Sequence, residues 1–203
     1  MKKESIIKTK SLNYKQLNQI TEIIKNENNE SIIANLKKKT LKKFISRILI
    51  SKNYNVFLLI VRSRVVGYII LKKAPNYSDY EIYRISYLIE LIYTFNLILY
   101  FNLLIKFFNL DKILFKNFEK KIYFNSINIS YLGINKKFQS SGYGKKLLKF
   151  AIKKTNFKSK FVSVETMNSK AGNFYKKKCK FKYLNKKIQF FNFVKVYFIK
   201  KKN

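Results

Sequence analysis

Apolar residues recur every three or four positions in the first part of the chain and then give way to continuous β-rich runs. The first spacing is typical of amphipathic helices and the second of buried strands. A polar break at residues 26–30 separates two helical patterns, and the tight Arg62-Ser63 connection joins two β-rich runs as a hairpin. The elements expected here are a strand at residues 5–10, helices at 13–26 and 33–48, and strands at 55–61 and 64–72.

The pattern is clearest at residues 127–151, where an alternating strand leads into an amphipathic helix. Ile127, Ile129 and Tyr131 alternate with polar residues before the strand closes on residues 132–134. The helix that follows has its apolar face and a row of lysines on opposite sides. Downstream we expect a strand at 160–165, a helix at 168–178, and a closing hairpin of strands at 181–186 and 189–199.

Glycines mark the start of that helix, in the run Gln139-Ser140-Ser141-Gly142-Tyr143-Gly144. The first N–H groups of a helix have no intrahelical partners, and the helix dipole favours an anion beside them. Glycine lets a ligand approach the backbone, so a strand that leads into such a helix start can hold a phosphate. Many helices begin with glycine and bind nothing, so the residues alone leave both phosphate binding and a purely structural turn open.

Two motifs in this part of the chain resemble those of one enzyme family. Gln139-x-x-Gly142-x-Gly144, preceded by Leu132-Gly133-Ile134, resembles the acetyl-CoA signature of the GNAT N-acetyltransferases. Asn168-x-x-Ala171-x-x-Phe174-Tyr175 is similar to a second segment of that family. The resemblance covers residues 127–181. It implies an α/β GNAT fold, with a mixed central sheet flanked by helices and with residues 1–203 in a single domain.

The resemblance also implies that the chain is an acyltransferase that moves the acetyl group of acetyl-CoA to a primary amine by direct attack in a ternary complex. The pantetheine arm would pair with the strand edge at Leu132, Gly133 and Ile134, and a backbone N–H near Ile134 would polarise the thioester carbonyl. Asn168 would contact the CoA arm or serve as a helix N-cap. The pyrophosphate would lie on the backbone N–H groups of Gln139, Ser140, Ser141, Gly142, Tyr143 and Gly144, and Lys145 is a further cofactor-binding residue.

Tyr175 and Glu165 are the expected catalytic residues. Tyr175 matches the family's tyrosine near the thioester sulfur, and a phenol with a pKa of about 10 keeps a proton for the departing thiolate. Because the chain has no histidine, Glu165 at a strand end is a candidate base. Entry of an already neutral amine through a water chain is the alternative. The family often has Gly-Phe after this helix, but here Lys180 precedes Phe181, one position late, which could shift the helix end near Tyr175.

A strongly apolar stretch separates the third expected strand from the fourth, and the family layout lacks it. We expect a helical insertion at about residues 76–122 that forms a soluble cap over the acceptor side. A membrane-spanning helix needs about 20 mainly apolar residues. Residues 85–105 come close to that length, but Glu90, Asn96 and Asn102 lie within them. A carboxylate there would cost about 2.5–3.5 kcal/mol on insertion. A span is therefore disfavoured, and a helical pair at a membrane surface is the remaining alternative.

Composition adds an extreme positive charge. Lys and Arg number 44 against 10 Asp and Glu, so the formal net charge is +34. An anionic partner such as nucleic acid, the ribosome or a membrane surface would explain this charge. AT-rich coding is the favoured explanation, because nearly all the cations are lysines spread along the chain. We expect any nucleic-acid contact to be non-specific. The alternative functions are a basic nucleic-acid- or ribosome-binding protein on a GNAT scaffold, and an acyltransferase with peripheral membrane contact.

The cysteine and histidine content limits the remaining chemistry. Cys179 is the single cysteine, so no intramolecular disulfide forms, and without histidine no zinc site is plausible. The first residues carry charge but no apolar core of signal-peptide length, which predicts a cytoplasmic location. The sequence does not specify the oligomeric state, nor whether the acceptor amine belongs to a small molecule or to a protein.

Overall fold

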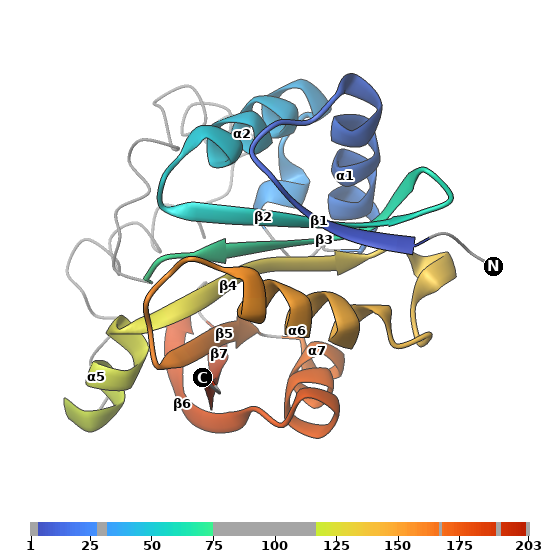
Figure 1. Cartoon of the computed structure of the whole chain (residues 1–203). Coiled ribbons are helices and arrows are strands. Elements are labelled where there is room, and N and C mark those ends of the chain that lie inside the picture. Colours follow the sequence, from blue (N-terminus) through green and yellow to red (C-terminus); the bar gives the residue numbers. More distant parts are fainter. Residues whose placement is uncertain (1–3, 28–31, 75–116, 167, 190–191, 202–203) are drawn as a thin grey trace. The chain divides into compact units, whose positions relative to one another are not determined.

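The computed structural model describes all residues except 1–3, 28–31, 75–116, 167, 190–191 and 202–203 (Figure 1). The chain divides into two compact units, Met1–Lys73 with Ile129–Phe157, and Ala74–Asn128 with Lys158–Asn203. Strand β4 (Ser126–Ile134) contributes residues to both units.

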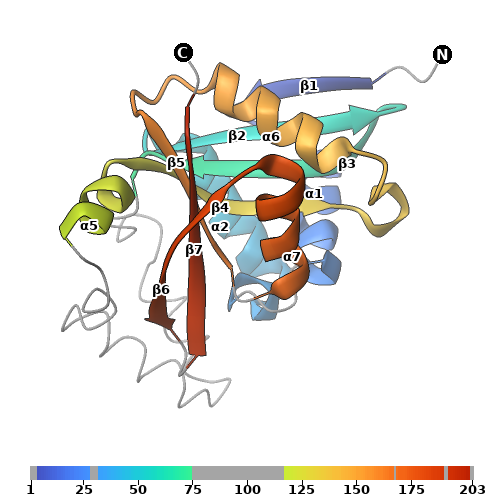
Figure 2. The same ribbon diagram turned by 90° about the horizontal axis from the view of Figure 1, so that it is seen from below.

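The first unit is a sheet with the strand order β1-β2-β3-β4. Both β1 with β2 and β2 with β3 pair antiparallel, with Ile7 opposite Leu58 and Phe57 opposite Ile69. In Figures 1 and 2, α1 and α2 lie on one face of this sheet and α6 lies on the other. Besides β4, the elements are β1 (Glu4–Thr9), α1 (Tyr14–Glu27), the 3-10 turn η1 (Ile32–Asn35), α2 (Lys38–Ile50), β2 (Tyr54–Val61), β3 (Arg64–Lys72), the 3-10 turn η3 (Lys136–Phe138) and α6 (Tyr143–Lys154).

Strand β2 is buried on both of its faces. Phe57, Leu58 and Leu59 follow one another and each is 0% exposed. Side chains alternate between the two faces of a strand, so three successive buried residues require a core on either side of the sheet. This explains why the sequence of β2 shows a continuous apolar run instead of an alternation.

The elements predicted for this unit are present, with one difference. The second helical pattern begins as η1 and resumes as α2, and Lys37 between them has an extended backbone (φ −55°, ψ 147°). Ile33 in η1 and Leu41 in α2 are both buried, at 2% and 0% exposure. Apolar spacing reports which side chains reach the core, so it did not reveal the break in the backbone.

The second unit has the strand order β4-β5-β7-β6. Of β4, only residues 126–128 belong to this unit. Strands β5 with β7 and β6 with β7 pair antiparallel. Val162 and Val196 lie in its core at 0% exposure. Its other elements are α5 (Asn117–Phe124), β5 (Phe161–Thr166), α7 (Ser169–Asn173), the π-helical turn η4 (Phe174–Lys178), β6 (Lys182–Gln189) and β7 (Asn192–Lys200).

These elements confirm the predicted α/β class, a mixed sheet flanked by helices. Strands β4 and β5 are neighbours in the strand order and are joined along the chain by α6, the kind of connection that parallel strands require. Of the insertion predicted at about residues 76–122, residues 117–122 belong to α5, and residues 76–116 lie outside the described part of the chain. Of the helices in that described part, none has the length and apolar character needed to cross a membrane.

Candidate active site

The connection between β4 and α6 contains the predicted pyrophosphate site. Residues 139–145 are called the amide loop here. The first hydrogen bond of α6 runs from the Lys146 N–H to the Gly142 carbonyl oxygen, at 3.0 Å. Within the described residues, the backbone N–H groups of residues 140–145 donate to no carbonyl or side chain. These N–H groups are therefore available to an anion.

Gly142 has a left-handed backbone, with φ 79° and ψ −6°, and it precedes the first helical residue. A Cβ atom built on Gly142 would meet no atom within 4 Å, so the space in front of this glycine is open. Ser140 also has a positive φ, of 64°. Left-handed residues in such turns direct neighbouring N–H groups towards a common concavity, which is a known form of anion site.

Glu27, at the end of α1, fastens the amide loop. One of its carboxylate oxygens accepts from the Gln139 side-chain amide at 2.7 Å, and the other accepts from the Lys136 N–H at 3.0 Å. The Gln139 amide also donates to the Ile134 carbonyl oxygen, at 2.9 Å. Gln139 thus holds the loop against α1 and the end of β4 through its side chain. Sequence reasoning missed Glu27, because nothing in the local sequence signals a contact between residues more than a hundred positions apart.

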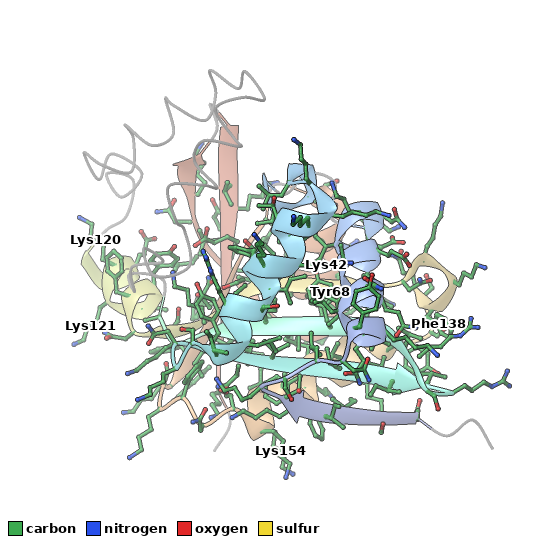
Figure 3. All side chains as sticks on the ribbon, turned by 90° about the horizontal axis from the view of Figure 1, so that it is seen from above. Lys42, Tyr68, Lys120, Lys121, Phe138 and Lys154 are labelled. Atoms are coloured by element: carbon green, nitrogen blue, oxygen red, sulfur yellow. The ribbon has the colours of Figure 1, made fainter. Side chains whose placement is uncertain are left out.

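The predicted pantetheine strand at residues 132–134 packs tightly at its glycine. A Cβ on Gly133 would lie 2.5 Å from Tyr68 Cε1 and 3.0 Å from Ile23 Cγ2, so only glycine fits beside the buried Tyr68 ring (Figure 3). Leu132 and Ile134 are half-buried. Gly133 therefore has a packing role, and contact of this strand with pantetheine stays a prediction.

Tyr175 lies in the second unit and is 5% exposed. Its ring packs against those of Phe174 and Phe181, with centroids 5.2 and 5.4 Å away. Burial, with a smaller contribution from Cys179, raises the pKa of the Tyr175 phenol well above its usual range. Among the described residues, none accepts a hydrogen bond from the Tyr175 hydroxyl. A buried donor with no acceptor in the described part of the chain is unusual, and such a group can meet a ligand.

The extra residue after Tyr175 is absorbed by a change of helix type. The helix predicted at 168–178 begins as α7 and continues as the wider π-helical turn η4. Lys180 takes a left-handed backbone, with φ 62°, where helices usually have glycine. The Phe181 N–H then donates to the Tyr175 carbonyl oxygen at 3.0 Å, and Phe181 is 3% exposed. Because a π turn accommodates one additional residue, Phe181 still reaches the Tyr175 ring.

Glu165 lies on β5 and is half-buried. The Tyr123 hydroxyl, from α5, donates a hydrogen bond to Glu165 Oε1. Tyr123 is 7% exposed and packs with Val196. This donor fixes the orientation of the candidate base, and sequence reasoning missed it because α5 follows the apolar stretch and carries no motif.

Asn168 is the N-cap of α7. Its side-chain oxygen accepts from the Ala171 N–H at 3.0 Å. The capping role that the sequence allowed is thus observed, and contact of Asn168 with CoA stays a prediction. The structure gathers the predicted cofactor residues, 132–134 and 139–145, in the first unit, whereas Glu165, Asn168 and Tyr175 lie in the second.

No protein-family model and no curated protein matches the sequence. Solved structures do resemble it. An acetyltransferase of the GNAT family from Staphylococcus aureus superposes with a TM-score of 0.55, at 16% identity over 98% of this chain and 100% of its own. An acetyltransferase from Thermus thermophilus gives 0.58, at 11% identity over 97% of each chain. The ribosomal-protein-S18-alanine N-acetyltransferase from Escherichia coli gives 0.54, at 10% identity over 99% of this chain and 96% of its own. The resemblance to the GNAT family seen in the two motifs is therefore confirmed at the level of the fold: this chain has the fold of the GNAT acetyltransferases.

Proposed function

We propose that this chain is an acetyl-CoA-dependent N-acetyltransferase that transfers an acetyl group to a primary amine by direct attack in a ternary complex. The observation that carries the proposal is the amide loop. Its N–H groups at residues 140–145 lack acceptors in the described part of the chain, and the space in front of Gly142 is open. A GNAT fold that had lost acyl-donor binding would have no need to keep the space in front of Gly142 open.

The residues present fit the pyrophosphate of acetyl-CoA. The free N–H groups and the positive end of the α6 dipole favour a dianionic group, and Gly142 lets it approach the backbone closely. Lys145 lies in the first turn of α6 and is exposed, so it adds positive charge nearby. When bound, acetyl-CoA supplies the thioester acyl group.

The chain's own residues supply the proton transfers in this proposal. The Tyr175 hydroxyl keeps its proton at neutral pH, because burial raises its pKa, and it gives that proton to the departing thiolate. Glu165, oriented by Tyr123, accepts the proton of the attacking amine. Entry of a neutral amine through water remains the alternative to Glu165. A backbone N–H near Ile134 polarises the acyl carbonyl.

The acceptor, the cellular location and the domain organisation belong to the same proposal. The acceptor is the amine of a small molecule or of a protein, the location is the cytoplasm, and residues 1–203 act as one domain. Lysines occur throughout the sequence, which supports the interpretation that the net charge of +34 gives only non-specific contact with nucleic acid.

Calorimetric titration with acetyl-CoA tests the proposal. The parent protein should bind, and a Gly142→Val variant should lose measurable binding, because the branched side chain fills the open space and strains a left-handed backbone. Lys149→Val is the matched control, since it introduces the same side chain at an exposed position of α6 outside the amide loop. It should bind like the parent. If Gly142→Val binds acetyl-CoA with parental affinity while it remains folded by thermal unfolding, the amide loop is not the acyl-donor site.

A further inference from the structure

The turn between β2 and β3 bears two cations that the proposed mechanism does not use. A hollow of about 490 Å³ lies at this turn and is lined by Val61, Arg62, Arg64 and Phe138. That volume falls in the range of about 300–1,000 Å³ that is usual for small-molecule sites. Arg62 and Arg64 are exposed, and within the described residues neither side chain forms a hydrogen bond or an ion pair. The hollow therefore offers two guanidinium groups that no carboxylate of the described residues neutralises.

The choice of residues at this turn favours a ligand over a structural role. Arg62 and Ser63 have φ values of 49° and 62°, the combination that a two-residue hairpin turn normally fills with Asn-Gly. Arginine has no intrinsic preference for a left-handed backbone, so the geometry of the turn does not explain its presence at residue 62. Guanidinium groups bind phosphate through two parallel hydrogen bonds, which lysine cannot do. The chain uses lysine almost everywhere else, so two arginines at one turn stand out chemically.

Phe138 lines the hollow and directly precedes the amide loop in the chain. Phe138 ends the η3 turn immediately before the amide loop, and its ring packs 6.3 Å from that of Tyr143, the first residue of α6. The Asn135 N–H donates to the Val66 carbonyl oxygen at 2.8 Å, which places the end of β4 beside the start of β3 and hence beside Arg64. The hollow and the amide loop are therefore adjacent within the first unit.

We propose that Arg62, Arg64 and Phe138 form a subsite for the 3′-phosphoadenosine end of the acyl donor. The two guanidinium groups hold the 3′-phosphate, and the Phe138 ring stacks on the adenine. This assignment rests on the proposed function and adds to it a basis for selecting CoA over its 3′-dephosphorylated form. Of the ligand's parts, only the nucleotide end combines a flat aromatic group with a phosphate that is free to meet arginine.

The test compares the affinities of acetyl-CoA and 3′-dephospho-acetyl-CoA by calorimetry at physiological ionic strength. We expect the parent to prefer acetyl-CoA by about tenfold or more. The Arg62→Asn/Arg64→Gln double variant should bind both ligands equally, with unchanged affinity for the dephosphorylated one. Asn suits the left-handed turn, so this variant should fold at least as well as the parent. Phe138→Leu should lower the affinities for both ligands by a similar factor, about tenfold, because stacking on the adenine does not depend on the 3′-phosphate.

The matched control removes two exposed cations elsewhere in the first unit. Lys153 and Lys154 are exposed and lie in the last turn of α6. Figure 3 shows Lys154 well apart from Phe138. Lys153→Gln/Lys154→Gln should keep the parental preference, since it changes only the general charge. The inference is overturned if the arginine variant keeps the preference or if the parent binds both ligands equally. A parent that binds neither ligand would instead contradict the proposed function and the subsite together.

Discussion

The amide loop and the Tyr175 turn (residues 174–181) provide the two halves of the proposed chemistry in opposite ways. The amide loop presents backbone N–H groups to open space, and its side chains matter little except where glycine keeps that space clear. The Tyr175 turn buries one side chain among aromatic rings, and its backbone matters mainly for placing that ring. Each contains a non-glycine residue with a positive φ, Ser140 in the loop and Lys180 in the turn.

This difference teaches how each half can fail. A site made of backbone is lost when a side chain blocks it or when its supports are removed. A site made of one side chain is lost when that chemical group is removed, even if the fold is intact. Substitutions in the two regions should therefore separate binding from catalysis.

The largest effect is expected at the side-chain site. Tyr175→Phe should lower kcat by about 10²–10⁴-fold, the usual value of general acid catalysis, with acetyl-CoA affinity nearly unchanged. Stability should not fall, because the variant removes a buried hydroxyl that has no acceptor in the described residues. Tyr183→Phe is the control, since Tyr183 is 50% exposed. Parental single-turnover rates in Tyr175→Phe would remove Tyr175 from the mechanism.

The same variant tests the pKa of Tyr175. The folded pKa lies above the unfolded value of about 10, so the native state holds this proton more tightly than the unfolded state does. The associated stability is fully present below pH about 10 and is lost as the pH rises above it. Urea unfolding across this range should show a steeper alkaline loss in the parent than in Tyr175→Phe. Equal slopes would mean that Tyr175 is not buried in solution.

The next largest effect is expected for Glu27, which supports the amide loop. Glu27→Ala removes two acceptors of the loop, one for the Lys136 N–H and one for the Gln139 amide. At about 0.5–1.5 kcal/mol for each hydrogen bond, acetyl-CoA affinity should fall about tenfold. Because the loop takes no part in proton transfer, kcat at saturation should change little. Glu22→Ala removes an exposed carboxylate from the same helix and should bind like the parent. Equal affinities of the two variants would show that the loop keeps its shape without Glu27.

A smaller effect is expected at Tyr123. Tyr123→Phe removes the hydrogen bond to Glu165, which stabilises the ionised carboxylate. The acidic limb of the pH–rate profile should move to higher pH, with about a two- to tenfold loss of kcat on that limb. Glu165→Gln should abolish the limb. If Glu165→Gln leaves the profile unchanged, the amine enters already neutral and Tyr123→Phe should have no effect on rate.

The smallest effect concerns the strained backbone that both regions share. Lys180→Gly should raise the free energy of unfolding by about 1 kcal/mol, because glycine adopts φ 62° without the cost that lysine has. In a chain of this size that corresponds to about 2–4 °C in Tm. Lys178→Gly, in the helical turn, should lower stability instead. A loss of kcat in Lys180→Gly would show that the lysine side chain itself has a function there.

Local sequence determined the elements and the geometry of the amide loop, for a physical reason. Helical and strand periodicities record which side chains meet a core, and glycine at Gly142 records a backbone that must be left-handed and open. These properties involve residues close together in the chain, so the sequence shows them directly. The position of the amide loop and the order of strands and helices were predictable on that basis.

Only the tertiary structure decided what supports these groups. Glu27 reaches Gln139, Tyr123 reaches Glu165, and Phe138 lies beside the two arginines of the β2–β3 turn, all across large separations in the chain. The π turn at residues 174–178 also depended on tertiary structure. The sequence shows the extra residue before Phe181, but the burial of Phe181 decided how the helix accommodates it. Such contacts arise when the packed core brings distant surfaces together, and no short-range preference of the chain encodes them.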